Sequence, residues 1–386
     1  MPVSKILHVA TDNKFIDHAH QIFERALPGG NDVFIIDEND ALEFVALLPT
    51  FQSKPSNVVN TLAGIDVSQY SFVVLHSLKL EFELVIDAFC GTPICWFGWG
   101  YDYYDLLGSE LDFLAPKTRR FQQRFLRWHG FKQWVKKCLG LPTEVPRQDQ
   151  IAQRIKLIEK IQWFSPVLEE EYELVRDSRE WHSFPAFISW NYGTLEDNYI
   201  KGFEGKVVQG NDIFIGNSAS VTSNHVDAIE ALARLSNISG DIYVPLNYGA
   251  APPRYTDAVV RSGAQSFGGA FKPLLNFMPI QEYVALLLNC GYVILNHKRQ
   301  QAVGNIVILL YLGARIFLRA ENPVYAHLMK RGVVVNSMDE LADKPELLNT
   351  PLSEAERERN RQAMIQTWSR ETGLKRTQAL ISTIST

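Results

Sequence analysis

Residues 290–323, CGYVILNHKRQQAVGNIVILLYLGARIFLRAENP, decide the fold of this chain. The apolar run at 292–295 predicts a buried strand, and a polar corner at 296–301 follows it directly. A long apolar segment then predicts a helix that ends at Gly313, and the apolar run at 314–318 predicts a second strand. Strand, helix and strand in this order form a parallel βαβ unit, so the polar corner lies where a strand meets a helix.

The same alternation of short apolar runs and longer helical patterns extends through the chain, which predicts an α/β protein with parallel sheets. At 386 residues the chain exceeds the roughly 250 to 300 residues of a single core, so we expect two Rossmann-like domains that face a central cleft. The predicted parts are 1–200, 206–350 and a C-terminal helix at 351–386 that returns across the junction. The expected strands are 5–10, 33–37, 72–76, 93–97, 161–164 and 186–189, then 212–216, 241–245, 264–267, 291–295, 314–318 and 333–336.

The overall composition is that of an ordinary globular protein, with 46% hydrophobic residues and a formal net charge of −5. There is no basic excess, so no nucleic-acid partner is expected. The four cysteines lack C-x-x-C spacing, which favours free thiols in a reducing compartment. The N-terminal stretch is not a signal peptide, and no segment is apolar enough to span a membrane. We therefore expect the protein in the cytoplasm.

Two strand-to-helix corners in the second half are candidate anion sites, because ligands of open α/β sheets bind outside the carboxyl ends of the strands. In the first corner, Gly216 allows close backbone approach, while Asn217 and Ser218 offer hydrogen bonds. The alternative is an ordinary polar loop. The second corner is the opening one, whose candidates are Asn296, Arg299, Gln300, Gln301, Gly304 and Asn305. A guanidinium and a helix N-terminus together would neutralise a departing diphosphate, and the alternative is a solvated loop.

Two further strand ends carry polar residues that complete the predicted donor site. Asn247 and Tyr248 follow the strand at 241–245, and the Tyr248 ring is suited to stacking on a base. Glu321 and Asn322 follow the strand at 314–318. A carboxylate at this position would hold sugar hydroxyls or would cap the next helix.

The segments NHKRQQAVGNIVILLYLG, FIGNS, VPLNYG, ENPVY and FMPIQEYVALLLNCGYV resemble bacterial glycosyltransferase family 56. The resemblance is strongest over 212–330 and covers short islands in the first half, namely ILHV, His76 and WGYDYYDL. It implies a GT-B fold, a dTDP-sugar donor bound to the second domain, and a polyprenyl-diphosphate-linked acceptor bound to the first. It also implies an enzyme at the cytoplasmic face of the inner membrane, as in enterobacterial common antigen synthesis.

The island at 99–106 follows a predicted strand and contains the candidate general base, Asp102. Its aromatic neighbours would raise the pKa of this carboxyl toward the value that a base needs. The alternative is that Asp102 caps the following helix. His76 is a second catalytic candidate, and the expected acceptor contacts are His8, Asp12, Trp99 and Tyr104.

No D-x-D sequence occurs in the chain, although a metal-bridged nucleotide diphosphate usually needs such a pair of carboxylates. The basic corner at 296–301 is therefore expected to neutralise the diphosphate. We predict no essential metal and no cofactor, so turnover should persist in the presence of a chelator.

Residues 117–140 hold eight lysines and arginines and no acidic residue, with aromatic residues at spacings of three and four. A cationic helix with an aromatic stripe is typical of helices that lie on anionic membranes. The alternatives are a stripe packed into the core and, less favoured, RNA binding. The predicted membrane-surface residues are Lys117, Arg119, Arg120, Arg124, Phe125, Arg127, Trp128, Lys132 and Trp134.

These observations together predict a peripheral membrane glycosyltransferase of surface polysaccharide synthesis. It would transfer an amino-deoxy sugar, such as 4-acetamido-4,6-dideoxygalactose, from dTDP to a lipid-linked oligosaccharide. One rival is a sugar-nucleotide epimerase or hydrolase on the same fold. The other is a non-catalytic partner of a polysaccharide assembly complex, which would bind no nucleotide.

Overall fold

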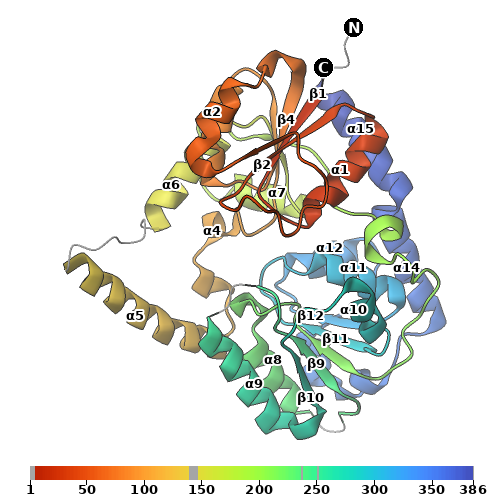
Figure 1. The fold of residues 1–386 in the computed structure, drawn as a ribbon. Helices are drawn as coiled ribbons and strands as arrows, with labels where there is room; N and C mark the ends of the chain where they lie inside the picture. The colour runs from red at the N-terminus through yellow and green to blue at the C-terminus, as the bar shows by residue number, and fades with distance from the viewer. Residues whose placement is uncertain (1–4, 139–146, 236–237, 250–251, 386) are drawn as a thin grey trace. The chain divides into compact units, whose positions relative to one another are not determined.

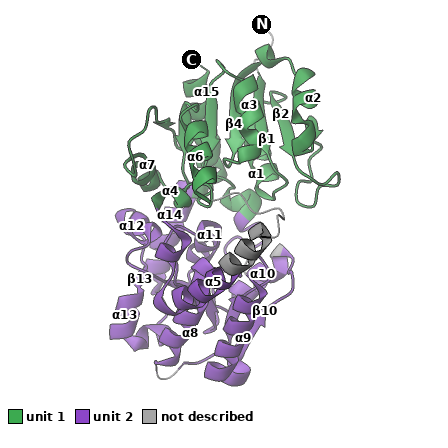
Figure 2. Cartoon of the chain, turned by 90° about the vertical axis from the view of Figure 1, so that its left-hand side faces the viewer, with its two compact units in different colours: residues 1–107, 145–198, 368–386 green, residues 108–144, 199–367 purple. Residues whose placement is uncertain are grey.

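The computed structural model describes residues 5–138, 147–235, 238–249 and 252–385, without the side chains of 129–138 and 280. The chain forms two compact units, which are coloured separately in Figure 2. Unit 1 comprises 1–107, 145–198 and 368–386, and unit 2 comprises 108–144 and 199–367.

Unit 1 is built on a seven-stranded parallel sheet in the order β3-β2-β1-β4-β5-β6-β7. Its central strands are almost wholly buried, which agrees with their continuous apolar sequence. The strands are β1 (Lys5–Ala10), β2 (Asn31–Ile36), β3 (Phe51–Ser53), β4 (Tyr70–His76), β5 (Ile94–Phe97), β6 (Trp163–Ser165) and β7 (Ala186–Phe187).

Helices α1 and α15 lie side by side against the unit 1 sheet (Figure 1), where Phe23 and Leu380 share one buried cluster with Phe72. The last helix of the chain therefore completes the core of the first unit. The helices of unit 1 are α1 (Phe15–Ala26), α2 (Val58–Ala63), α3 (Glu83–Ala88), α4 (Tyr104–Leu107), α6 (Arg147–Ile158), α7 (Glu169–Arg176) and α15 (Arg370–Ile384), and Leu195–Tyr199, at the passage to unit 2, forms a π-helical turn.

Unit 2 is built on a six-stranded parallel sheet in the order β10-β9-β8-β11-β12-β13. The strands are β8 (Ile213–Ile215), β9 (Ile242–Pro245), β10 (Phe271–Leu274), β11 (Tyr292–Leu295), β12 (Arg315–Leu318) and β13 (Asn336–Ser337). The helices are α5 (Pro116–Cys138), α8 (His225–Ala233), α9 (Pro253–Phe267), α10 (Ile280–Leu287), α11 (Val303–Leu312), α12 (Pro323–Lys330), α13 (Met338–Asp343) and α14 (Glu354–Trp368). The expected α/β class with two parallel sheets is confirmed.

Each sheet has one point at which the strand order reverses. In unit 1 the chain builds outward from β1 through β2 and β3, and then continues on the other side from β4. In unit 2 the reversal lies between β8 and β11. Loops that leave two adjacent strands in opposite directions open a crevice at the carboxyl ends of those strands, so these two points are the expected ligand positions.

The secondary structure differs from the sequence prediction at two strands, β10 and β3. Residues 264–267 do not form a strand, because α9 continues to Phe267 and ends at Gly268, which has φ +54°. The strand follows as β10, and Phe271 packs against Gly263 so closely that a Cβ there would lie 2.1 Å from the ring. The short strand β3 was not predicted, because Phe51 is the single apolar residue among its three.

Residues 108–144 group with unit 2, whereas the prediction placed them in the first domain. The reason is the start of α5, whose first backbone N–H groups need acceptors. Asp227 of α8 accepts hydrogen bonds from the backbone N–H of Lys117 and Thr118, both at 2.9 Å, and Asn224 accepts one from Ala115 at 2.8 Å. Phe121 then packs against the core of unit 2. Residues 368–386 group instead with unit 1.

Cys90, Cys95 and Cys290 are free thiols, and the last two are buried. The fourth cysteine, Cys138, lies outside the described side chains. Across the described parts of the chain, no helix combines the length and the apolar character needed to cross a bilayer.

Candidate active site

The two predicted corners of unit 2 meet at the reversal point between β8 and β11. Gln301 joins them, because its Nε2 donates to Asn217 Oδ1 at 2.9 Å and its Oε1 accepts from Thr222 Oγ1 at 2.7 Å. Ser218 is buried, and its carbonyl accepts a hydrogen bond from Ser223. Sequence segments separated by 79 to 84 residues therefore form one polar surface at the carboxyl edge of the sheet.

A second link between the corners runs through two asparagines. Asn224 Nδ2 donates to the Asn296 carbonyl at 3.0 Å, and Asn296 Nδ2 donates to the Asn224 carbonyl at 3.3 Å. The Asn296 Oδ1 atom accepts from Arg319 at 3.1 Å. Asn224 adopts φ +53°, which asparagine tolerates better than most residues, and this conformation directs the chain into α8. These contacts give Asn296 a scaffolding role beneath the corner.

Arg299 and Gln300 lie between this scaffold and the first turn of α11. The Arg299 side chain is half-buried and Gln300 is buried. The residue before α11, Ala302, has φ +66°, and its own side chain makes no capping hydrogen bond. Gly304 and Asn305 form the first turn, and a Cβ on Gly304 would lie 3.3 Å from the Tyr199 ring. A guanidinium therefore stands beside a helix N-terminus, where backbone N–H groups have no acceptor within the helix.

The remaining predicted donor residues also lie at strand ends of this sheet. Glu321 pairs with Lys298 at 3.3 Å and with Arg319 at 2.9 Å, so its carboxylate stabilises the corner. Asn322 caps α12 through the backbone N–H of Val324 at 2.9 Å. After β9, the Tyr248 side chain is 52% exposed, and Asn247 donates to the Asn276 carbonyl at 2.6 Å.

Two fully buried histidines lie close to the corners, and sequence reasoning did not assign them. Burial lowers the pKa of both His225 and His297 to about 3, so the rings are neutral. His225 packs against Gly216, where a Cβ would lie 2.5 Å from its Nε2 atom, and Gly216 also has φ +74°. Glycine is therefore required at position 216 by both space and backbone conformation. Both ring nitrogens of His297 have no hydrogen-bond partner among the described residues.

In unit 1, Asp102 is completely buried and its two oxygens accept three hydrogen bonds. The donors are the backbone N–H of Leu78, the indole N–H of Trp96 and the backbone N–H of Trp99, each at 2.8 Å. Burial raises the pKa of the Asp102 carboxyl, and these hydrogen bonds oppose that shift. The geometry is that of a carboxylate that fixes the loops after β4 and β5.

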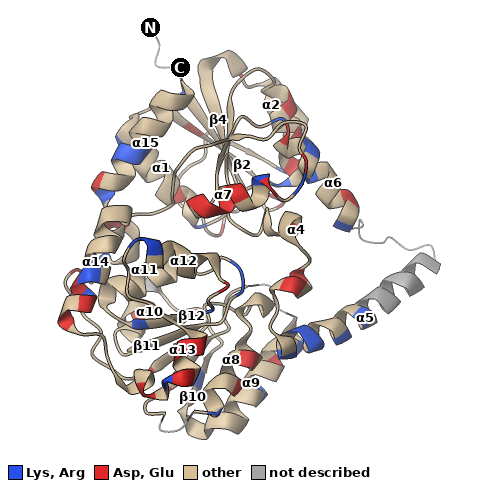
Figure 3. Ribbon diagram, turned by 180° about the vertical axis from the view of Figure 1, so that it is seen from behind, with Lys and Arg blue, Asp and Glu red and all other residues tan. Residues whose placement is uncertain are grey.

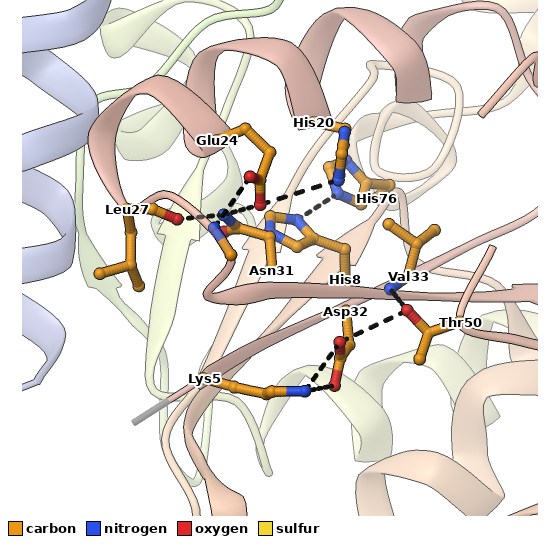
Figure 4. Close-up of polar contacts among 11 residues, drawn as sticks. Lys5, His8, His20, Glu24, Leu27, Asn31, Asp32, Val33, Thr50 and His76 are labelled. Atoms are coloured by element: carbon orange, nitrogen blue, oxygen red, sulfur yellow. Dashed lines mark hydrogen bonds and ion pairs between the residues drawn. The ribbon is translucent and has the colours of Figure 1, made fainter. Parts of the chain in front are cut away.

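His76 and His8 form a buried pair at the reversal point between β1 and β4. His8 Nδ1 lies 3.0 Å from His76 Nε2, and burial lowers the pKa of both rings far below that of an exposed histidine. His8 Nε2 contacts the Asn31 side chain at 3.3 Å (Figure 4), and His76 Nδ1 contacts the Tyr192 hydroxyl at 2.7 Å. Sequence reasoning selected both histidines but missed Asn31 and Tyr192.

Two of the other predicted acceptor contacts, Asp12 and Tyr104, already make internal hydrogen bonds through their side chains. Asp12 accepts from the backbone N–H groups of Glu43, Phe44 and Val45 at distances between 2.5 and 3.2 Å. The Tyr104 hydroxyl donates to the buried carboxylate of Glu171 at 2.5 Å. Trp99 is half-buried and packs with Phe15 and Tyr192 at the same edge.

The basic helix α5 begins on unit 2 and bears its cations along the described part (Figure 3). Lys117 pairs with Glu230 at 2.5 Å, and Arg119 lies 3.8 Å from Asp112. The guanidinium of Arg254 lies 4.9 Å from the Trp128 ring centre. Arg120, Arg124 and Arg127 are exposed, Phe125 is half-buried and Trp128 is 43% exposed. The side chains of Lys132 and Trp134 lie outside the described residues.

No group of three or more histidine, cysteine, aspartate or glutamate side chains is placed to hold a metal in the described part of the chain. The expectation that turnover needs no metal stays a prediction. That the Arg299 guanidinium and the N-terminus of α11 neutralise a diphosphate also stays a prediction.

Two parallel α/β sheets give this chain the GT-B fold, which its structural neighbours share. Its fold is similar to a glycosyltransferase from Rickettsia africae, with 11% identity, a TM-score of 0.62 and 98% of each chain covered. It is also similar to the Anabaena protein HepE in complex with UDP, with 12% identity, a TM-score of 0.61 and 98% and 100% coverage. A UDP-forming trehalose-phosphate synthase from Burkholderia xenovorans has 11% identity, a TM-score of 0.60 and 99% coverage of both chains.

Residues 195–361 match the family model of 4-alpha-L-fucosyltransferases, glycosyl transferase group 56. This match confirms the resemblance to family 56 that the corner segments predicted. It spans the unit 2 strands from β8 to β13, and it includes both corners at the reversal point.

Proposed function

We propose that this glycosyltransferase transfers an amino-deoxy sugar, 4-acetamido-4,6-dideoxygalactose or a close analogue, from dTDP to a polyprenyl-diphosphate-linked oligosaccharide. The observation that carries the proposal is the corner of unit 2, where Arg299 stands beside the N-terminus of α11 at the reversal point. The solved structures of HepE with UDP and with UDP-glucose support a sugar-nucleotide donor. The family match supports a deoxy sugar, because the family is described by fucosyl transfer.

In this proposal the donor diphosphate binds at the corner with its oxygens toward Arg299 and the first turn of α11. Negative charge develops on the diphosphate as the glycosidic bond breaks, and a preorganised cation and helix dipole stabilise it without rearrangement. Gln301 and Asn217 hold the corner in one arrangement. Tyr248 is exposed beside it and is the candidate for stacking on the base.

The acceptor is proposed to bind at the carboxyl edge of the unit 1 sheet, where the loops after β1, β4 and β5 converge. The attacking hydroxyl must lose its proton during the transfer, and Asp102 and His76 were the candidates for this role. The three internal hydrogen bonds of Asp102 favour a structural role for this carboxylate. His76 lies at the end of β4 and reaches this edge through Tyr192.

The exposed cations of α5 support peripheral binding to the anionic inner face of a bacterial membrane. Arg120, Arg124 and Arg127 project from a helix that carries no acidic residue, and each basic residue near such a surface contributes about 1 kcal/mol. A lipid-linked acceptor resides in this membrane. Surface binding would therefore bring the enzyme to its substrate without a spanning helix.

A thermal-shift screen with dTDP, UDP, GDP and CMP tests the proposal. A nucleotide at about 100 times its dissociation constant stabilises the folded state by about 2.7 kcal/mol, so dTDP should raise the melting temperature more than the other three. A shift with none of them would leave a non-catalytic partner protein as the better account. A shift with dTDP but no sugar transfer to a lipid-linked acceptor would favour an epimerase or hydrolase.

A further inference from the structure

Two side chains of unit 1, Tyr101 and Lys79, lie together at the carboxyl edge of the sheet. Lys79 follows β4 and Tyr101 follows β5, and these two strands pair with His76 opposite Phe97. The Lys79 ammonium nitrogen lies 5.0 Å from the centre of the Tyr101 ring. Tyr101 is 45% exposed, and because one hydroxyl oxygen is a minor part of the surface of a tyrosine, an exposure of this size includes ring atoms.

One buried carboxylate holds the backbone on both sides of this pair. Asp102 accepts a hydrogen bond from the backbone N–H of Leu78, the residue before Lys79, at 2.8 Å. It accepts a second from the backbone N–H of Trp99, two residues before Tyr101, also at 2.8 Å. A loop held in this way loses little further freedom when a ligand binds, so its exposed side chains are preorganised for binding.

The Tyr101 ring continues an aromatic cluster that starts at the reversal point of the sheet. Trp99 packs edge-on against Phe15, at the start of α1, with ring centres 5.6 Å apart. The Trp99 ring centre lies 6.1 Å from that of Tyr101, again edge-on. The reversal point between β1 and β4 is the expected ligand position of this sheet, so Tyr101 is the solvent-exposed end of a cluster that begins at that position.

Contacts within the protein account for little of this arrangement. Lys79 is half-buried and forms no ion pair with any residue that the structure describes. A cation–π contact at an exposed site is weak, and ordering a lysine side chain costs conformational entropy of at least similar size. The Tyr101 hydroxyl lies beside Ser77, so contact with a ligand is expected from the ring and from the ammonium group.

An aromatic ring beside an ammonium group is suited to binding a carbohydrate. The ring covers the apolar C–H face of a sugar, and the ammonium group donates hydrogen bonds to the hydroxyl oxygens at its rim. A neutral sugar fits this edge better than a phosphate does, because the exposed Glu81, two residues after Lys79, adds negative charge close to Tyr101.

We propose that Tyr101 and Lys79 bind a sugar ring of the acceptor oligosaccharide, with the Tyr101 ring against its C–H face and Lys79 donating to its hydroxyl oxygens. Asp102 is the positioning residue that holds both loops. The inference rests on the proposed glycosyl transfer, because it names the residues that contact the acceptor in unit 1.

Kinetics with a polyprenyl-diphosphate-linked disaccharide as the acceptor tests this contact. Tyr101→Ala should raise the acceptor KM about tenfold, because the stacking contact is lost, and should leave dTDP binding unchanged. Tyr101→Phe should keep the wild-type KM, since the ring remains. Lys79→Met, which keeps an apolar stem, should raise the KM about fivefold through the loss of a hydrogen bond.

The matched control is Phe187→Ala. Phe187 is also an aromatic residue of unit 1 and is 38% exposed, but it lies on β7, two strands away from β5. The acceptor KM of this variant should equal that of the wild type. An increase as large as that in Tyr101→Ala would show that the effect is not specific to the proposed site.

Competition by polyprenyl diphosphate without a sugar identifies the part of the acceptor that Tyr101 contacts. Its inhibition constant should be the same for the wild type and Tyr101→Ala. A tenfold weaker inhibition of Tyr101→Ala would place the contact at the diphosphate or the lipid and would overturn the sugar contact.

The outcomes separate this inference from the proposed function. A wild-type protein that binds no nucleotide contradicts the proposed function, and the proposed acceptor contact with it. A wild-type protein that transfers sugar, with the same acceptor KM in Tyr101→Ala, contradicts only the role of Tyr101.

Discussion

At the scale of single residues, neighbouring polar groups in this protein have different tasks. Gln301 and Asn296 hold the two corners of unit 2 together through internal hydrogen bonds. Arg299 donates to the Gln300 carbonyl at 3.3 Å, and its planar guanidinium is suited to binding two phosphate oxygens at once. Function at this corner is therefore expected to depend on the arginine, and stability on its neighbours.

Replacing Arg299 by alanine should weaken dTDP binding by roughly tenfold or more, the effect of losing a charge-assisted hydrogen bond. Arg299→Lys should give an intermediate affinity, because it keeps the charge but loses the paired donors. Isothermal titration calorimetry measures the change. The control is Arg234→Ala, since Arg234 is an exposed arginine paired with Glu230 on α8. Equal affinity in Arg299→Ala and the wild type would remove this residue from the site.

Asp102→Asn should lower the free energy of unfolding by about 2 kcal/mol. The amide NH2 group would face at least one N–H donor whose hydrogen bond the carboxylate accepts in the wild type. The three donors from Leu78, Trp96 and Trp99 leave no orientation that satisfies all contacts. Chemical denaturation measures the loss, and turnover is measured well below the melting temperature. An unchanged stability with turnover abolished would restore Asp102 as the catalytic base.

At the scale of secondary structure elements, the Asp197 carboxylate links the π-helical turn to helices α1 and α15 of unit 1. Asp197, in the π-helical turn, binds Arg25 of α1 at 2.5 Å and Arg370 of α15 at 2.7 Å. The chain leaves unit 1 after residue 198 and returns to it at 368. The passages at 198/199 and 367/368 are therefore anchored within unit 1 by the same side chain.

Burial alone would raise the pKa of the Asp197 carboxyl, but the hydrogen bonds from Arg25 and Arg370 outweigh it and hold the pKa below its usual value. A depressed pKa stabilises the fold above the ordinary aspartate pKa of about 4, and this contribution is lost as the pH falls below it. Asp197→Asn should thus cost about 2 kcal/mol at neutral pH and reduce the acid dependence of unfolding.

The matched control for this prediction is Asp177→Asn, which breaks an exposed pair with Arg176 at 2.7 Å. Exposed ion pairs contribute little, so its unfolding free energy should be almost unchanged. Urea denaturation of both variants at several pH values gives the comparison. Similar behaviour of the two variants would show that the Asp197 contacts do not anchor the passages.

The exposed arginines of α5 are predicted to bind anionic membranes. Reversing three exposed charges, Arg120, Arg124 and Arg127 to glutamate, should abolish binding to vesicles rich in anionic lipid at low salt. The control reverses three exposed lysines elsewhere in unit 2, namely Lys201, Lys206 and Lys344, and should retain most of the binding. Cosedimentation with vesicles measures both. Wild-type protein that stays in the supernatant would contradict the membrane proposal.

At the scale of the whole molecule, local pattern predicted most strands and both corners of unit 2. Apolar runs bounded by glycine and polar residues identify a buried parallel strand such as β11, and the polar residues at its end identify the edge. The reversal point between β8 and β11 could not be predicted this way, because it depends on strand order. Gln301 thus appeared as a candidate ligand, and only the fold places it between Asn217 and Thr222.

Long-range contacts account for what the sequence did not predict. The Asp227 carboxylate that caps α5 lies about 110 residues away along the chain, so the unit to which α5 belongs is not a local property. The Asn31 and Tyr192 side chains join the histidines across separations of 23 and 116 residues. Amides and phenols at such positions carry no local signal that distinguishes them from surface residues.

The central claim is that the corner of unit 2 holds the donor diphosphate, and a crystal structure with dTDP tests it most directly. The account predicts diphosphate oxygens about 3 Å from the Arg299 guanidinium and from backbone N–H groups in the first turn of α11. A diphosphate bound elsewhere, or an Arg299 side chain that pairs with an internal carboxylate in the complex, would contradict it.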